Sequence, residues 1–184
     1  MPVLSVAHAV LAVTAVALAT APANPAPDPA KLLAASPSAT IEHETPHLSL
    51  RASVSPETIA PGGRLSIAVD VRPKPGMHVY APGSPYRAVV LALKRHPLLH
   101  VHDTEYPEPA LYLFKPLNEA VLVYSEPFRL SVDVTAGRTA GQRAKLRKQK
   151  TVPIAGSIEY QACDDRVCYL PVSIPISWEV RVTR

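Results

Sequence analysis

The two cysteines of this chain, Cys163 and Cys168, are the residues whose type and spacing suit chemistry. Four residues separate them, and alternating segments on either side place the pair at a hairpin turn. Cysteines this close can form an intramolecular disulfide. A disulfide can either stabilise a fold or exchange electrons with other thiols.

Length and composition indicate that the domain does not need a disulfide in order to fold. The chain has 184 residues, of which 47% are hydrophobic, so a single domain can bury a sizeable core. Secreted domains that depend on disulfides usually have fewer than about 80 residues. The 21 prolines, the sparse aromatic residues and many short alternating segments predict an all-β domain without long helices.

The N-terminal part of the chain predicts export. An apolar run ends at Ala21 and Ala23, which fit an A-x-A cleavage site, so we expect a signal peptide over residues 1–23. No Lys or Arg precedes the run, which leaves open an uncleaved membrane anchor. Residues 24–46 are rich in Ala, Pro and Ser and predict a flexible linker. The domain over residues 47–184 is then expected in the periplasm, where disulfides persist.

Period-two alternation of apolar and polar residues predicts the strands of this domain. Each strand with such alternation buries one face. Roughly seven to nine short strands suit a two-sheet sandwich, with a barrel as the alternative. The expected strands lie near residues 48–54, 65–71, 77–81, 87–93, 119–124, 128–135, 151–163 and 168–182.

The same alternation predicts how the cysteines face. Tyr160 and Ala162 lie on the apolar face of the incoming strand, so Cys163 is expected on the polar face, near solvent. Cys168 falls on the apolar face of the outgoing strand, yet disulfide partners across a hairpin must point the same way. The register therefore has to break. Pro171 cannot donate to a ladder and is the expected site of a bulge.

Three segments carry a resemblance to a known family. They are Gly76 to Gly83 (GMHVYAPG), Phe114 to Tyr124 (FKPLNEAVLVY), and Tyr160 to Pro171 with both cysteines. Over about residues 47–184 the chain resembles the N-terminal periplasmic domain of the thiol:disulfide interchange protein DsbD. The resemblance implies an immunoglobulin-like two-sheet sandwich. It also implies a cysteine pair that accepts electrons from a thioredoxin-like donor and passes them to other extracytoplasmic thiol proteins.

The resemblance also implies roles for single residues. Cys168 would form the mixed disulfide with a partner and Cys163 would resolve it, whereas the alternation makes Cys163 the more exposed of the two. Phe114 stands where the family has the aromatic residue of a cap loop that shields the pair, and a plain core position is the alternative. The membrane-spanning and thioredoxin-like portions of DsbD are missing, so the electron donor is expected on a separate chain.

Further aromatic residues surround the expected site. His78 and Tyr80 share one face of their strand and match the family segment that lines the active site, so His78 could lower a cysteine pKa. An ordinary surface histidine is the alternative. Tyr160 and Tyr169 flank the cysteine segment and are also expected in its surroundings.

Other partners and groups are not expected. No cofactor is implied, and His96, His100 and His102 lack the accompanying cysteine or carboxylate cluster of a metal site. The basic run over residues 138–150 predicts a solvated hairpin loop, and nucleic acid is not expected for an exported chain with a net charge of +4. A membrane is a partner only if the leader stays uncleaved. The competing function is a sandwich-type binding or assembly module with an inert disulfide.

Overall fold

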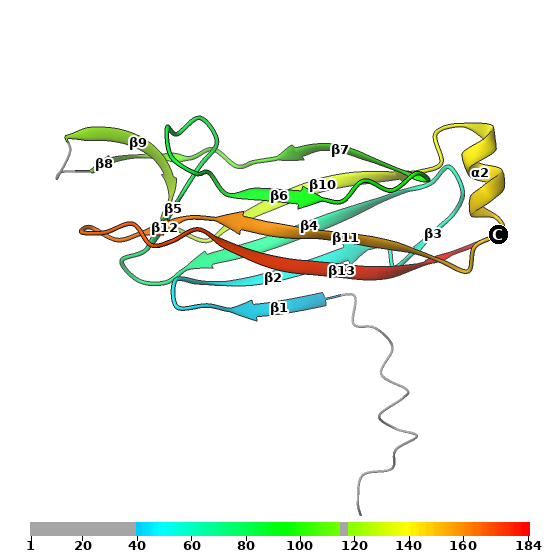
Figure 1. Cartoon of the computed structure of the whole chain (residues 1–184), viewed down its shortest axis with the longest axis horizontal. Helices are drawn as coiled ribbons and strands as arrows, with labels where there is room; N and C mark the ends of the chain where they lie inside the picture. Colours follow the sequence, from blue (N-terminus) through cyan, green and yellow to red (C-terminus); the bar gives the residue numbers. More distant parts are fainter. Residues whose placement is uncertain (1–39, 115–117) are drawn as a thin grey trace, which may run out of the picture. The chain divides into compact units, whose positions relative to one another are not determined.

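The computed structural model describes residues 40–114 and 118–184, which are almost entirely β structure (Figure 1). The predicted signal peptide over residues 1–23 lies outside the described residues, as does the predicted linker up to residue 39. No helix within the described ranges has the length and apolar character needed to cross a membrane.

The first sheet has five antiparallel strands that alternate between buried and exposed side chains. In β4, for example, Leu65, Ile67, Val69 and Val71 are buried, while the residues between them are less so. This alternation lets one face of the sheet cover the core and the other face meet solvent. The strand order is β1 (Thr40–Glu44), β2 (Leu48–Ser55), β4 (Arg64–Pro73), β10 (Phe128–Ala136) and β7 (Leu99–Glu105).

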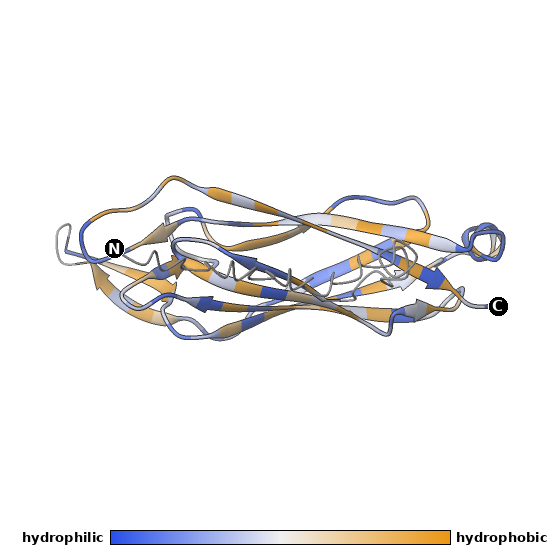
Figure 2. Ribbon diagram, turned by 90° about the horizontal axis from the view of Figure 1, so that it is seen from below, coloured by the Kyte–Doolittle hydropathy of each residue, from blue (hydrophilic) through white to orange (hydrophobic). Residues whose placement is uncertain are grey.

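The second sheet completes a sandwich. Its strands are β3 (Thr58–Ile59), β13 (Val172–Val182), β11 (Thr151–Tyr160) and β6 (Val90–Leu93), and only β3 runs parallel to its neighbour. Buried residues of both sheets, such as Leu130 and Ile158, form one apolar cluster. Figure 2 shows the alternation as bands of hydrophobic and hydrophilic colour along the long strands. The predicted all-β, immunoglobulin-like sandwich is therefore confirmed.

A third, smaller sheet was not predicted. It consists of β12 (Ala162–Cys163), β5 (His78–Tyr80), β9 (Glu119–Tyr124) and β8 (Ala110–Phe114). These strands gather at the end of the sandwich opposite the only helix within the described residues, α2 (Ala140–Leu146) (Figure 1). The third sheet contains one of the two cysteines, so it forms part of the surroundings of the disulfide.

Two predictions about local structure were wrong. Residues 40–44, expected in the linker, form β1 and pair with β2 from Thr40 opposite Ser53 to Glu44 opposite Ser49. Part of the basic run expected as a hairpin loop forms α2. Its first turn is stabilised by a capping box between Thr139 and Gln142, and its last turn buries Leu146.

Close packing of β6 on β11 gives a testable prediction at Gly156, which pairs with Leu93. A Cβ atom added to Gly156 would overlap the backbone carbonyl oxygen of Ala92. Because the strand backbone cannot move away without disturbing its ladder, we expect Gly156→Ala to lower the free energy of unfolding by about 1–3 kcal/mol, measured by urea denaturation.

Gly141→Ala is the matched control. Gly141 lies in α2, and a Cβ atom there would meet no neighbouring atom. Alanine is the better helix former, so this variant should be as stable as the wild type or up to about 1 kcal/mol more stable. Wild-type stability of Gly156→Ala would contradict the tight approach of the two strands.

Candidate functional site

The two cysteines form a disulfide at the tip of the hairpin that joins β11 to β13. Their Cα atoms lie 4.1 Å apart, and the two residues face each other as an isolated antiparallel bridge. The turn between them is closed by the backbone N–H of Asp164, which donates to the carbonyl oxygen of Val167 at 3.0 Å.

A bulge before β13 brings the cysteines opposite each other. The regular ladder ends where Tyr160 pairs with Val172, and beyond it the N–H of Tyr169 donates to the carbonyl oxygen of Ala162 at 2.9 Å. Between these two pairs the incoming strand advances by two residues, from Tyr160 to Ala162, whereas the outgoing strand advances by three, from Tyr169 to Val172. The additional residue lies in the pair Leu170-Pro171, which confirms the bulge predicted at Pro171. Without it, Cys163 would lie opposite Tyr169.

The disulfide is exposed on one side only. Cys163 is 0% exposed, whereas Cys168 is classed as exposed. The alternation had predicted Cys163 near solvent, and that prediction was wrong. The chain leaves the sheet of β11 after Tyr160, and β12 pairs with β5 instead, so Tyr80 and Val123 of the third sheet pack on the side of Cys163 that would otherwise meet solvent.

The hydroxyl group of Tyr80 contacts both sulfur atoms. Its oxygen lies 3.3 Å from Sγ of Cys163 and 3.3 Å from Sγ of Cys168. Tyr80 itself is 2% exposed, and its ring stacks on Tyr86 with centroids 4.6 Å apart. Burial raises the pKa of the Tyr80 hydroxyl, and the nearby Glu119 carboxylate raises it further. Tyr80 therefore presents a protonated hydroxyl to the disulfide.

His78 is buried beside the pair and is not the surface histidine of the alternative interpretation. It is 3% exposed, lies opposite Cys163 in the ladder between β5 and β12, and packs against Tyr112 with ring centroids 4.6 Å apart. Burial lowers the pKa of His78, against the opposing effect of Asp165 and Asp164. The imidazole is thus neutral at neutral pH and supplies no positive charge in this disulfide form.

Hydrogen bonds from the chain itself hold the acidic turn between the cysteines. Asp164 accepts the backbone N–H groups of Val167 and Arg166 at 2.8 Å each, and it accepts the hydroxyl of Tyr169 at 2.9 Å. These bonds, that from Val167 first, hold the pKa of Asp164 below its usual value. The carboxylate therefore fixes the shape of the turn and, with it, the position of Cys168.

Two tyrosines that the sequence analysis missed tie this end of the domain together. Tyr112 of β8 donates its hydroxyl to Asp165 at 2.7 Å, and Tyr86 donates to the Glu119 carboxylate of β9. Tyr112 stands two residues before Phe114 on the same strand face, and Tyr86 closely follows the segment around Tyr80. This closeness to Phe114 and Tyr80 is the only signal in the sequence that could have identified Tyr112 and Tyr86 as site residues.

The other predicted site residues lie at different distances from the pair. Tyr160 belongs to the main core, where its hydroxyl donates to Thr45 at 3.0 Å. Tyr169 is half-buried and packs on His47, with ring centroids 4.4 Å apart. Phe114 is half-buried at the end of β8 and adjoins the undescribed residues 115–117, so its role as a cap stays a prediction.

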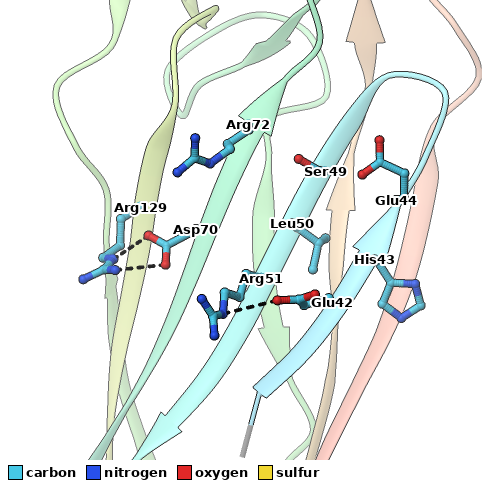
Figure 3. Close-up of a pocket in the computed structure, with 9 residues that line it drawn as sticks. All are labelled: Glu42, His43, Glu44, Ser49, Leu50, Arg51, Asp70, Arg72 and Arg129. Atoms are coloured by element: carbon cyan, nitrogen blue, oxygen red, sulfur yellow. Dashed lines mark hydrogen bonds and ion pairs between the residues drawn. The ribbon is translucent and has the colours of Figure 1, made fainter.

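Another cavity lies away from the disulfide. Its volume is about 560 Å³, and it is formed by β1, β2, β4 and β10 (Figure 3). Two ion pairs join charged side chains that line it, Arg129 with Asp70 at 2.7 Å and Arg51 with Glu42 at 3.5 Å. A second cavity, of about 400 Å³, reaches the turn between the cysteines through Asp165, and His78 and Tyr112 are also among the residues that line it.

Burial of a neutral histidine predicts a pH-dependent stability. Between the lowered pKa of folded His78 and the ordinary value of 6.5, the unfolded chain binds more protons, so the contribution of His78 to stability falls as the pH drops below 6.5. We expect the free energy of unfolding of the wild type, relative to His78→Phe, to decline from about pH 7.5 to about pH 5.5.

The matched control is His43→Gln, which removes a histidine that is exposed on β1 instead of buried beside the cysteine pair. If the difference in unfolding free energy between the wild type and His78→Phe stays constant over this pH range, that result would contradict the burial of a neutral imidazole.

Comparison with known proteins reveals the fold. No protein-family model and no curated protein matches the sequence. The N-terminal periplasmic domain of ScsB from Proteus mirabilis is similar in structure, with 15% identity, a TM-score of 0.50 and 73% of this chain covered. This chain covers 49% of the ScsB structure, about half its length. The N-terminal domain of DsbD from Neisseria meningitidis, solved in the reduced form, aligns with a TM-score of 0.38 and 17% identity over 63% of this chain and 82% of that one. The described domain therefore has the fold of the N-terminal periplasmic domain of ScsB.

Proposed function

We propose that this chain is an extracytoplasmic thiol:disulfide exchange module. The pair Cys163 and Cys168 would cycle between disulfide and dithiol and pass reducing equivalents from a thioredoxin-like donor on a separate chain to other thiol proteins. One observation carries the proposal: the disulfide joins an exposed residue, Cys168, to a fully buried one, Cys163. Exchange needs one sulfur that a partner can reach.

The asymmetry supports an order of events. A thiolate of the donor attacks Sγ of Cys168, a new bond joins the two sulfurs, and the electron pair of the broken disulfide moves to Sγ of Cys163. A second thiolate of the donor then attacks the mixed disulfide and releases Cys168. Reduced Cys168 attacks the disulfide of an acceptor, and Cys163 resolves that complex by re-forming the bond to Cys168.

The proposed compartment follows from the predicted signal peptide and from the disulfide. Intramolecular disulfides persist in oxidising compartments such as the periplasm, and the ScsB domain is itself described as periplasmic. A thiol protein is the kind of partner that the exposed sulfur of Cys168 favours. No cofactor is needed, because the electron pair moves between sulfur atoms.

Single-cysteine variants test the assignment of Cys168 as the sulfur that partners reach. Cys163→Ser leaves an exposed thiol and Cys168→Ser leaves a buried one. We expect the thiol of Cys163→Ser to react with an aromatic disulfide reagent at least about tenfold faster than that of Cys168→Ser, because access limits the reaction. Only Cys163→Ser should trap a stable mixed disulfide with a thioredoxin-like protein.

Unfolding in urea is the internal control, since it exposes both thiols and should make the two rates similar. The opposite order of reactivity in the folded variants would reverse the roles of the cysteines. A reduction potential below about −300 mV for the wild-type disulfide would favour an inert structural bond, and one above about −250 mV would support exchange.

We propose in addition that Phe114 shields the pair. Phe114 shares its strand face with Tyr112, whose hydroxyl binds Asp165 in the cysteine turn. Truncation at Phe114 should therefore open a path for small thiols, and we expect Phe114→Ala to be reduced by dithiothreitol several-fold faster than the wild type. Leu113→Ala is the control, because Leu113 is exposed on the opposite face of β8. Identical reduction rates for Phe114→Ala and the wild type would rule out a cap at this position.

A further inference from the structure

We propose that Tyr80 is a catalytic residue of the exchange reaction, whose hydroxyl donates a hydrogen bond to the Cys163 thiolate that leaves when a partner attacks Cys168. The inference rests on the proposed exchange function and gives a role in the reaction to Tyr80, which the sequence placed only in the surroundings of the pair. Its starting point is the position of the hydroxyl oxygen, 3.3 Å from each of the two sulfurs.

The direction of these contacts follows from chemistry. Disulfide sulfurs carry no hydrogen, so Tyr80 is the donor in both contacts, and sulfur is a weak acceptor. Among the described residues, the two sulfurs are the only hydrogen-bond partners of this hydroxyl. A buried hydroxyl with no better acceptor is ready for a stronger one, and a thiolate is such an acceptor.

The hydroxyl is held in place by the packing of its ring. Tyr86 stacks on one side, and His78 meets the ring edge-on with centroids 5.9 Å apart. The backbone of Tyr80 pairs with Val123 of β9 and forms a bridge to Ala88. A donor fixed in this way does not need to reorganise when charge develops, which is the basis of electrostatic stabilisation in active sites.

The leaving thiolate needs such a donor because of where it forms. Cys163 is fully buried in a cluster with Tyr80, Val121 and Val123. A charge in apolar surroundings is costly unless it is hydrogen-bonded, and burial keeps water away. Tyr80 remains protonated, since burial and Glu119 both raise its pKa, and it can therefore donate.

The exchange step balances without a proton transfer at Tyr80. The partner thiolate forms a bond to Sγ of Cys168, the bond between Cys168 and Cys163 breaks, and its electron pair stays on Sγ of Cys163. The O–H of Tyr80, shared between two weak acceptors before the step, then points to the thiolate alone. A stabilised leaving thiolate departs faster, so the hydroxyl accelerates reduction of the disulfide.

The experiment compares Tyr80→Phe with Tyr86→Phe. Both variants keep their stacked rings, but only Tyr80 contributes a hydroxyl that touches sulfur, whereas the hydroxyl of Tyr86 binds Glu119. We expect Tyr80→Phe to slow reduction of the disulfide by dithiothreitol about tenfold, the usual scale for a hydrogen bond to a charged group. Tyr86→Phe should change the rate less than about twofold.

A second measurement separates a catalytic role from a structural one. The thiolate of Cys163 is titrated by its ultraviolet absorbance in the Cys168→Ser background, with and without Tyr80→Phe. The neighbouring titratable groups, His78, Glu119, Asp164 and Asp165, are the same in both proteins. We expect loss of the hydroxyl to raise the pKa of the Cys163 thiol, while the thermal unfolding temperature stays near that of the parent.

Two results would overturn the proposal: an unchanged thiol pKa and reduction rate in Tyr80→Phe, or an equal effect of Tyr86→Phe. A failure of the proposed exchange function would give a different set of results. In that case the wild-type disulfide would resist reduction by partner-type thiols, yet the titration of Cys163 in the Cys168→Ser background would still report whether Tyr80 stabilises the thiolate.

Discussion

The path of the chain after Tyr160 determines the chemistry of this domain. Up to that residue β11 belongs to the sandwich and pairs with β13 and β6. Within the next three residues the strand changes sheets and pairs with β5, while the outgoing chain gains one residue at Leu170-Pro171. The change of sheets buries Cys163, and the added residue brings Cys168 opposite it. A disulfide with one covered and one open sulfur results from these two local departures from a regular ladder.

The surroundings of the disulfide serve two different needs. On the outer side, Asp164 binds the backbone of the turn and the hydroxyl of Tyr169, so the exposed sulfur is displayed on an ordered loop. On the inner side, Tyr80 places its hydroxyl within 3.3 Å of both sulfurs, Val121 and Val123 pack against Cys163, and the neutral His78 lies opposite it. An ordered turn outside favours encounter with a partner, and a fixed hydroxyl inside lets a thiolate form where water does not reach.

The sequence predicted those features that depend on neighbouring residues. Strands with clean alternation, such as β4, β10 and β13, lie where period two placed them, and the proline at position 171 marked the bulge. The third sheet could not be predicted, because β5 is buried at all three positions and β12 has two residues, so neither shows a period. The burial of Cys163 likewise depends on Tyr80 and Val123, which are distant in the sequence and meet the hairpin only in the folded chain.

Strand β1 has a consequence for the behaviour of the protein in solution. It is the last strand of the five-stranded sheet, and one side of its backbone has no neighbouring strand among the described residues. An open edge of this kind can pair with another chain and start edge-to-edge aggregation, which proteins resist by placing charges there. Glu42 and Glu44 are exposed on β1 and form ion pairs with Arg51 and Lys74. These negative charges would hinder a second copy of the chain from pairing with β1 and extending the sheet. The edge strand that they protect is far from the two cysteines in the sequence.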